Sequence, residues 1–151
     1  MKAGELAPDF ELSDETGTTR RLKEFLVSGP VVLFFYPAAM TAGCTAESCH
    51  FRDLAAEFAE VGASRIGISP DTVAKQQEFS AKHSFDYPLL SDPDGAVATR
   101  FGVRRSFGPL LTKRQTFVID TDGTVLEVIK SELRMSVHAD KALSVLRARK
   151  V

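Results

Sequence analysis

Apolar residues along the chain fall into short runs that alternate with segments of helical periodicity. The runs are rich in β-branched and aromatic residues and are bounded by turn residues, which predicts strands. The predicted strands cover residues 10–12, 31–36, 65–69, 87–90, 116–119 and 125–129. The second of them is apolar at every position and is followed by Pro37, as is typical of a central strand buried on both faces.

Helical spacing of apolar residues occurs in three further segments. One covers residues 45–60 and closes near Gly62, a second begins at Pro70 and Asp71, and the third covers residues 137–148. The last two strands flank a turn at residues 120–123 and form a β-hairpin, which adds antiparallel strands to the sheet. The pattern predicts an α/β fold, a three-layer sandwich with a mixed central β-sheet. No linker or repeat interrupts residues 1–151, so we expect a single domain.

The composition changes this picture little but excludes some functions. The chain has 151 residues, 44% of them hydrophobic and 26% charged, which is a globular balance. Its net charge of −1 gives no bulk attraction to nucleic acid or to an anionic membrane. Residues 1–10 lack the apolar core of a signal peptide, and the run at 31–36 is too short to span a bilayer. We therefore expect a cytoplasmic protein, in which a cysteine pair is more often catalytic, redox-active or metal-binding than structural.

Cys44 carries the most informative chemistry in the chain. It follows the predicted central strand by a short loop, and a helix is expected to begin between Thr41 and Cys44. This is the edge at which open α/β sheets bind ligands. The thiolate is the nucleophilic form of cysteine, and the amides and macrodipole of a helix N-terminus favour that anion. The same amides, with a nearby arginine, can also stabilise charge on the leaving oxygen of a peroxide.

Two neighbours of Cys44 fit the same chemistry. Thr41 precedes it by three residues, so one helical turn brings its hydroxyl near the sulfur. There it can donate to the thiolate or to a bound peroxide oxygen. Pro37 has no N–H, and its rigid ring can cover the sulfur from water without competing for hydrogen bonds.

The motif Pro37-x-x-x-Thr41-x-x-Cys44 resembles the active-site motif of the peroxiredoxins. The wider run at residues 35–53 is similar to the Q-type subgroup, also called bacterioferritin comigratory proteins. A second cysteine five residues after the first, here Cys49, is characteristic of that subgroup. The similarity extends over nearly the whole chain, from residues 8–10 to residues 116–120. One departure is Ala42, where many relatives have proline, and we expect it to change only the stiffness of the loop.

The resemblance implies a thioredoxin-like fold with Cys44 as the peroxidatic cysteine, in a pocket shaped by Pro37 and Thr41. It also implies an arginine just before a Thr-Phe strand, a place that Arg114 occupies. The remaining arginines before that strand are interpreted as surface charges: Arg100, Arg104 and Arg105. The implied substrates are hydrogen peroxide and organic hydroperoxides, and the implied reductant is thioredoxin or a similar dithiol. No metal or organic cofactor is expected, because both electrons come from sulfur.

The spacing of Cys44 and Cys49 constrains how they can react. On a regular helix their Cα atoms would lie roughly 8–9 Å apart, whereas a disulfide requires about 4.4–6.8 Å. A bond between them therefore requires the first helical turns to unwind, which Gly43 makes easier. We infer a cycle in which peroxide oxidises Cys44 to a sulfenic acid, the helix opens, and Cys49 attacks that sulfur to form a disulfide.

Other interpretations of these residues stay open at this point. Cys44 taken alone could be a buried structural cysteine. Cys49 lies on the apolar face of its helix and could fill the core, which would leave a one-cysteine peroxidase resolved by an external thiol. Glu47 either pairs with the active-site arginine or extends a charged helix face. His138 lies far from the motif in sequence and is expected at the surface.

Two other functions and a zinc site compete with the peroxidase interpretation. A thioredoxin-like disulfide reductase or isomerase uses Cys-x-x-Cys, and here the second cysteine comes two positions later. A redox sensor or holdase would use the helix opening as a signal without rapid turnover. Structural zinc requires four ligands, usually from two pairs, and no second pair accompanies Cys44, Cys49 and His50.

The assembly state is expected to be a monomer rather than a dimer, because many Q-type relatives are monomers. The apolar, loop-like segment at residues 107–111 is interpreted either as a partner surface or as a lid over the site.

Overall fold

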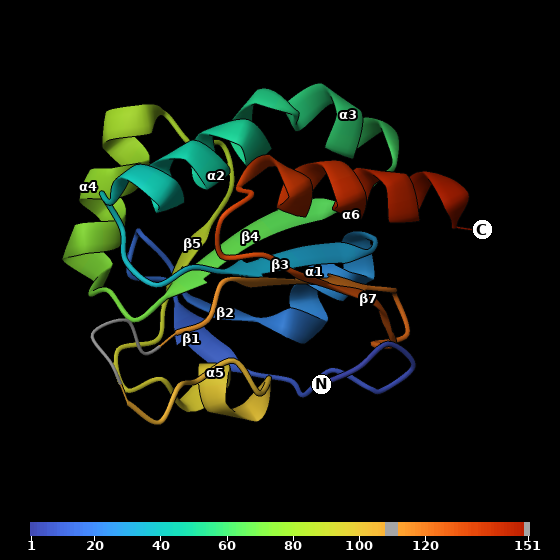
Figure 1. The fold of residues 1–151 in the computed structure, drawn as a ribbon, viewed down its shortest axis with the longest axis horizontal. Helices are drawn as coiled ribbons and strands as arrows, with labels where there is room; N and C mark the ends of the chain where they lie inside the picture. The colour runs from blue at the N-terminus through green and yellow to red at the C-terminus, as the bar shows by residue number, and fades with distance from the viewer. Residues whose placement is uncertain (108–111, 150–151) are drawn as a thin grey trace.

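A mixed sheet of seven strands lies at the centre of the part of the chain that the computed structural model describes, residues 1–107 and 112–149 (Figure 1). The strands are β1 (Glu11–Ser13), β2 (Thr19–Arg21), β3 (Val31–Phe35), β4 (Ser64–Ser69), β5 (Leu89–Ser91), β6 (Gln115–Ile119) and β7 (Val125–Lys130). Their order across the sheet is β2-β1-β5-β4-β3-β6-β7. β4 pairs in parallel with β3 and with β5, whereas the other neighbouring pairs are antiparallel.

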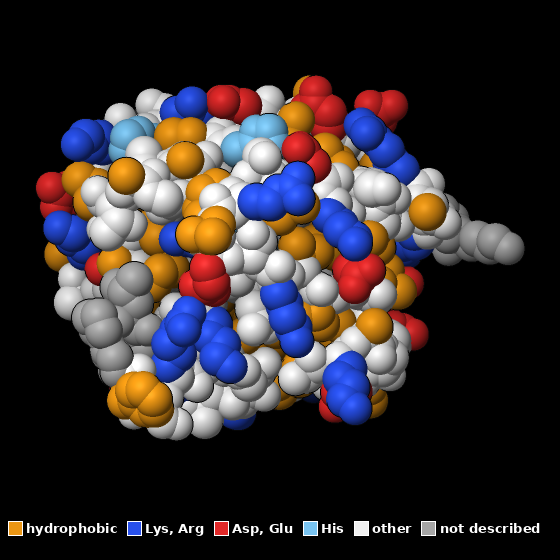
Figure 2. All heavy atoms as spheres, in the orientation of Figure 1, with side chains coloured by type: hydrophobic (Ala, Val, Ile, Leu, Met, Phe, Trp, Pro, Cys, Tyr) orange, Lys and Arg blue, Asp and Glu red, His pale blue; other side chains and the backbone are white. Residues whose placement is uncertain are grey.

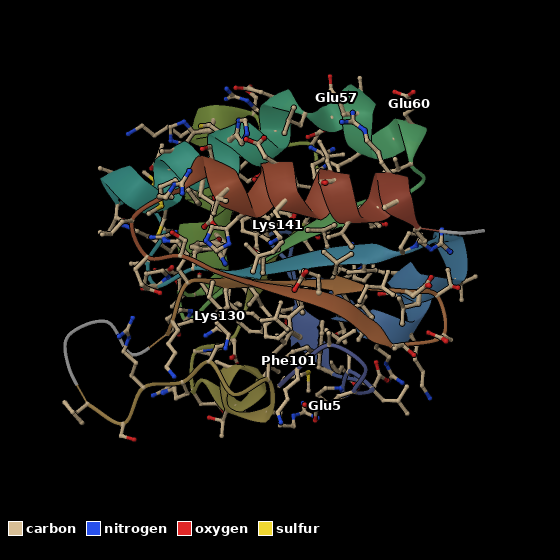
Figure 3. All side chains as sticks on the ribbon, turned by 45° about the vertical axis from the view of Figure 1, so that its right-hand side comes forward. Glu5, Glu57, Glu60, Phe101, Lys130 and Lys141 are labelled. Atoms are coloured by element: carbon tan, nitrogen blue, oxygen red, sulfur yellow. The ribbon has the colours of Figure 1, made fainter. Side chains whose placement is uncertain are left out.

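Helices cover both faces of this sheet. They are α1 (Leu22–Ser28), α2 (Ala42–Asp53), α3 (Ala55–Glu60), α4 (Val73–His83), α5 (Ala96–Arg100) and α6 (Ser136–Ala148). The core on one face contains residues of α2, α3, α4 and α6, and the core on the other contains residues of α1 and α5. Figure 3 shows Phe101 on the α5 side of the sheet, with Glu57 and Glu60 on the outer side of α3. The predicted three-layer α/β sandwich with a mixed sheet is confirmed.

The central strand β3 explains why the run at residues 31–36 is apolar at every position. Residues 31, 33 and 35 face the core with α1 and α5, and residues 32, 34 and 36 face the core with the other four helices. All six residues are 0% exposed. Phe34 also stacks on Phe51 of α2, with 4.2 Å between ring centroids and 9° between the ring planes. The strand thus holds the helix that follows it in the chain.

The predicted strands agree with β1 and β3–β7 to within two residues at each end. The hairpin of β6 and β7 and the final helix are likewise confirmed. Three short elements escaped prediction, namely β2, α1 and α5. Each has seven residues or fewer, too few to establish a clear hydrophobic period.

The prediction of one continuous helix over residues 45–60 is wrong. α2 ends at Asp53, and α3 begins after Leu54, which has φ −96° and ψ 22°. Arg65 of β4 donates from Nη1 to the carbonyl of Phe51 at 2.8 Å. In a regular helix the amide of Ala55 would donate to that carbonyl. The guanidinium therefore supports the break by binding a carbonyl near the end of α2.

The surface carries charges of both signs. Figure 2 shows Lys and Arg side chains among acidic and apolar ones on one face of the molecule. None of the helices in residues 1–107 and 112–149 has the length and apolar content needed to cross a membrane. In the segment interpreted as a partner surface or lid, Phe107 is 85% exposed, and residues 108–111 lie outside the described part of the chain.

Replacement of Phe51 by alanine is expected to lower the free energy of unfolding by about 3–5 kcal/mol, because it removes a buried ring and leaves a cavity. Denaturant titration followed by circular dichroism measures the change. The control is Val27→Ala, which alters a side chain that is 88% exposed and should change stability by less than about 0.5 kcal/mol. Equal effects of the two substitutions would contradict the packing of α2 on β3.

Candidate active site

The loop between β3 and α2 brings Cys44 to the carboxyl edge of the central strand. After Phe35 the chain passes through the buried Pro37, and α2 begins directly after its N-cap residue, Thr41. Met40 has a left-handed backbone with φ 70°, which costs roughly 1–2 kcal/mol for a residue with a Cβ. Such strain persists only where the surrounding structure imposes it, often at functional sites. Cys44 lies in the first turn of α2 and is 0% exposed.

Asp71 holds this loop against the end of β4. Its Oδ2 accepts hydrogen bonds from the backbone amide of Ala39 and from Ser69 Oγ, both at 2.7 Å. The sequence placed Asp71 only at the start of a helical segment and gave it no role in the active site. Its position directly after a predicted parallel strand, at the same sheet edge as Cys44, is the signal that could have identified it.

Arg114 is the side chain that lies against the sulfur. Its Nη2 is 3.2 Å from Sγ of Cys44, and its Nη1 donates to Oε1 of Glu47 at 2.7 Å. Burial acts to lower the pKa of Arg114, but the charges of Glu47 and Cys44 outweigh it and raise that pKa, so the side chain stays a cation. A buried guanidinium at this distance stabilises the negative charge of a thiolate. Of the two alternatives for Glu47, the structure shows the pairing with the active-site arginine.

Two further contacts position Arg114. Its backbone amide donates to Oε2 of Glu132 at 2.8 Å, and Oε1 of Glu132 accepts from Arg105 Nη2 at 2.8 Å. Gly43 permits the close approach of the guanidinium, because a Cβ at this position would lie 3.3 Å from Arg114 Nη2. Glu132 ties the segment before β6 to the segment after β7, and the contact at Gly43 lets Arg114 lie against α2. No motif in the sequence indicated either one.

The other arginines before β6 take different positions. Arg100 donates to the carbonyl of Asp9, and Arg104 donates to the carbonyl of Asp94. Arg105 reaches the site only through Glu132. Within the described residues, Arg114 is thus the one member of the group that contacts Cys44.

Thr41 lies at the start of α2 as expected, but its hydroxyl does not donate to Cys44. Its Oγ1 donates to the carbonyl of Ala38 at 2.8 Å. Donation from this hydroxyl to the thiolate or to a peroxide therefore stays a prediction. Among the described residues, no side chain caps the first turn of α2, so the amides of that turn are available to an anionic ligand.

Cys49 lies further along α2 and is partly buried rather than enclosed in the core. It is a free thiol, as is Cys44. Burial raises the pKa of the Cys49 thiol, and the nearby Arg52 opposes that effect. Between the two cysteines, the carbonyl of Ser48 accepts a hydrogen bond from the Tyr87 hydroxyl at 2.7 Å. This bond fastens the middle of α2 to Tyr87, two residues before β5.

His138 is buried, and the prediction that it lies at the surface is wrong. Its side chain is 0% exposed. Its Nδ1 lies 2.7 Å from Thr116 Oγ1, and its Nε2 lies 2.8 Å from the carbonyl oxygen of Ser131. The available signal was its spacing: His138 precedes Ala142 by four residues, which puts both on the apolar face of the last helix.

The arrangement is suited to thiol redox chemistry rather than to metal binding. Residues 1–107 and 112–149 contain no group of three or more His, Cys, Asp and Glu side chains placed to hold a metal ion. A buried cysteine at a helix N-terminus instead faces a buried arginine from the neighbouring strand segment. Fold and site together define a thiol-based redox protein of the thioredoxin-like class.

Comparison with known proteins identifies the family. The model of the AhpC/TSA family matches residues 3–128. The crystal structure of Peroxidoxin BcpB from Mycobacterium tuberculosis matches with a TM-score of 0.96 and 62% identity, covering 100% of this chain and 99% of that one. Peroxiredoxin Q from chloroplasts of Arabidopsis thaliana is 40% identical over 148 residues, which are 98% of this chain and 68% of that protein.

A third relative connects the fold to a reaction. The bacterioferritin comigratory protein of Xanthomonas campestris, described for its alkyl peroxide reduction activity, matches with a TM-score of 0.86 and 33% identity, and the match covers 98% of each chain. The chain therefore belongs to the AhpC/TSA family, as a peroxiredoxin of the Q type, and it is a peroxidase.

Arg114→Gln is expected to lower the second-order rate constant for oxidation of Cys44 by hydrogen peroxide by about 100-fold or more, because it removes the cation next to the reacting sulfur. Stopped-flow fluorescence or competition kinetics measures this constant. The matched control, Arg100→Gln, removes a cation that donates to the carbonyl of Asp9 and should leave the constant unchanged within error. Equal constants for the two variants would show that the guanidinium does not assist the reaction.

Proposed function

We propose that this peroxiredoxin reduces hydrogen peroxide and organic hydroperoxides with Cys44 as the peroxidatic residue and Cys49 as the resolving residue. The observation that carries the proposal is the buried contact of 3.2 Å between Arg114 Nη2 and Cys44 Sγ. It puts a fixed positive charge beside a sulfur at the first turn of a helix. Pro37 and Thr41 complete the proposed pocket.

The first chemical step is a nucleophilic displacement at oxygen. The Cys44 thiolate attacks one peroxide oxygen, an S–O bond forms, and the O–O bond breaks. The leaving oxygen takes a proton and departs as water or as an alcohol, so the peroxide gains two electrons and Cys44 becomes a sulfenic acid. Arg114 and the amides of the first turn of α2 stabilise the charge that develops on the leaving oxygen. The Thr41 hydroxyl is the proposed hydrogen-bond partner of the peroxide.

The second step requires α2 to open, because five residues of helix keep the two cysteines too far apart to bond. Opening breaks the contacts of Arg114 with Cys44 and Glu47, whereas the stack of Phe51 on Phe34 can hold the second half of the helix. The Cys49 thiolate then attacks the Cys44 sulfur, the S–S bond forms, and the oxygen leaves as water after protonation. Opening also exposes Cys49, which relieves the burial that raises its pKa.

An external dithiol completes the cycle. Two thiol–disulfide exchanges return both cysteines to thiols and oxidise the dithiol to a disulfide. We take thioredoxin or a similar cytoplasmic dithiol as this reductant. The chain is proposed to act as a monomer of one domain, as the resemblance to Q-type peroxiredoxins implies. No metal or organic cofactor enters these steps, since sulfur supplies both electrons.

A Cys49→Ser variant treated with one equivalent of peroxide is expected to accumulate a sulfenic acid on Cys44, because the resolving thiol is missing. Trapping with a sulfenic-acid reagent and mass spectrometry measure it, and Cys44→Ser serves as the unreactive control. If Cys49→Ser turns over with thioredoxin as fast as the wild type, an external thiol resolves Cys44 instead. If the wild type stops after one turnover with thioredoxin present, the alternative of a redox sensor or holdase is favoured.

Tyr87→Phe is expected to speed disulfide formation about fivefold, because it removes a hydrogen bond to Ser48 that holds α2 closed and that is worth about 1 kcal/mol. Stopped-flow measurement of the step that follows peroxide reduction tests this, and hydrogen exchange at residues 42–48 should rise in parallel. The matched control is Tyr36→Phe, which removes a hydroxyl that donates to Gln76 and not to α2. A disulfide rate that Tyr87→Phe leaves unchanged would mean that α2 does not open as far as Ser48.

A further inference from the structure

Glu47 and His138 form a buried pair that the proposed cycle does not use. Glu47 lies on α2 and His138 on α6, two helices that lie side by side over one face of the sheet (Figure 1). Both side chains are 0% exposed, and Oε2 of Glu47 is 3.6 Å from Nδ1 of His138. The other carboxylate oxygen of Glu47, Oε1, accepts from Arg114. The pair therefore connects directly to the cation that contacts Cys44.

The hydrogen bonds of His138 fix which of its nitrogens carries the proton. Nε2 lies 2.8 Å from the carbonyl oxygen of Ser131, which can only accept, so Nε2 is the donor. Nδ1 lies 2.7 Å from the Thr116 hydroxyl. In a neutral imidazole Nδ1 is then the acceptor, and the hydroxyl of Thr116 donates to it. The ring nitrogen that lies toward Glu47 thus carries no proton that it could give to the carboxylate.

An ionised Glu47 would fit this environment poorly. Its Oε2 has no hydrogen-bond partner among the described residues, and Nδ1 of His138, 3.6 Å away, has no proton to donate to it. A buried carboxylate oxygen without a donor is costly, whereas a protonated carboxyl carries no charge and supplies a donor of its own.

The electrostatics agree with the geometry. Burial raises the pKa of Glu47 to about 7, although Arg114 opposes this, and Glu132 acts in the same direction as burial. Burial also lowers the pKa of His138. The proton of the pair is therefore expected on the carboxyl rather than on the imidazole.

We propose that His138 is a positioning residue which keeps Glu47 protonated in the reduced enzyme, so that Arg114 directs its positive charge to Cys44. The inference rests on the proposed function, because it assumes that Cys44 is the reacting thiolate. A protonated Glu47 still accepts a hydrogen bond from Arg114 and so holds the guanidinium in place. An ionised Glu47 would instead compete with the Cys44 thiolate for the same cation.

Few other titratable groups face the pair. Arg114 approaches from the segment before β6, Glu132 from the segment between β7 and α6, and Cys44 lies on α2 itself. As the pH rises through about 7, Glu47 loses its proton and draws Arg114 toward itself. Reactivity of Cys44 toward peroxide should therefore fall on the alkaline side of neutrality.

Infrared spectroscopy of the reduced wild-type protein tests the protonation state without reference to activity. A band of a buried protonated carboxyl is expected at about pH 6, one unit below the pKa of Glu47. It should disappear as the pH rises past 8, and it should be missing from Glu47→Gln. Loss of the band in Glu47→Gln assigns it, whereas a wild-type spectrum without it overturns the proposal even if the peroxidase activity is as described.

Kinetics of His138→Asn provide the second test. The asparagine amide can place an N–H near the position of Nδ1, where it would donate to Glu47 and favour the carboxylate. The rate constant of Cys44 with hydrogen peroxide at neutral pH should fall about tenfold, the effect of one pKa unit. Adding Glu47→Gln to His138→Asn should restore the rate to that of Glu47→Gln alone, because no carboxylate is left to compete.

A purely structural role for His138 gives a different result. His138→Asn and Glu47→Gln would then lower the rate constant of Cys44 with hydrogen peroxide additively. The decrease of this rate constant at alkaline pH would also persist in Glu47→Gln. Either outcome overturns the proposal. Should His138→Asn fail to fold, the pH profile of Glu47→Gln and the infrared spectrum of the wild type still decide the question. A wild type that does not react with peroxide would refute the proposed function and leave the infrared result standing.

Discussion

The site depends on one buried guanidinium. Arg114 is only 7% exposed at its side chain, and a buried cation must be compensated by partners of opposite charge or by strong acceptors. Cys44 supplies the opposite charge as a thiolate, Glu47 supplies a hydrogen-bond acceptor, and the two lie three residues apart on one face of α2. The requirement to pair this cation therefore fixes the rotation of α2 about its axis and its distance from the start of β6. Gly43 has no side chain that would obstruct this approach.

The same interaction limits the part of α2 that can move. Cys44 and Glu47, which hold the guanidinium, both lie before Ser48, and opening for the disulfide must release them. The Tyr87 hydroxyl holds the carbonyl of Ser48 while the helix is closed, and beyond it the stack of Phe51 on Phe34 and the guanidinium of Arg65 fasten the end of the helix. The helix thus has a first half, up to Ser48, that opens and a second half that carries Cys49 at its start and is anchored in the core at Phe51. The break between α2 and α3 lies beyond both halves and does not reach the cysteines.

The sequence predicted the parts of this molecule that depend on local pattern. An apolar run of six residues followed by Pro37 was enough to locate β3, and the position of Cys44 after it followed directly. Arg114 came from resemblance to a family, because its contact with Cys44 joins residues 70 positions apart. His138 was misplaced for a related reason: a polar residue on an apolar helix face is buried only if partners such as Thr116 and Ser131 satisfy it. Those partners lie on other elements.

The proposed protonation of Glu47 makes the two steps of the cycle respond to pH in opposite directions. Glu47 lies in the part of α2 that opens, so opening moves its carboxyl from a buried position, where the pKa is about 7, toward water, where a glutamate pKa is about 4.3. A carboxyl whose pKa is raised in the closed state stabilises the closed state. This stabilisation is complete at pH values below the pKa of the open state, and it is lost as the pH rises through the pKa of the closed state. Acidic conditions therefore favour the closed helix that reacts with peroxide. More alkaline conditions favour the open helix in which Cys49 reaches Cys44, and each opening releases a proton.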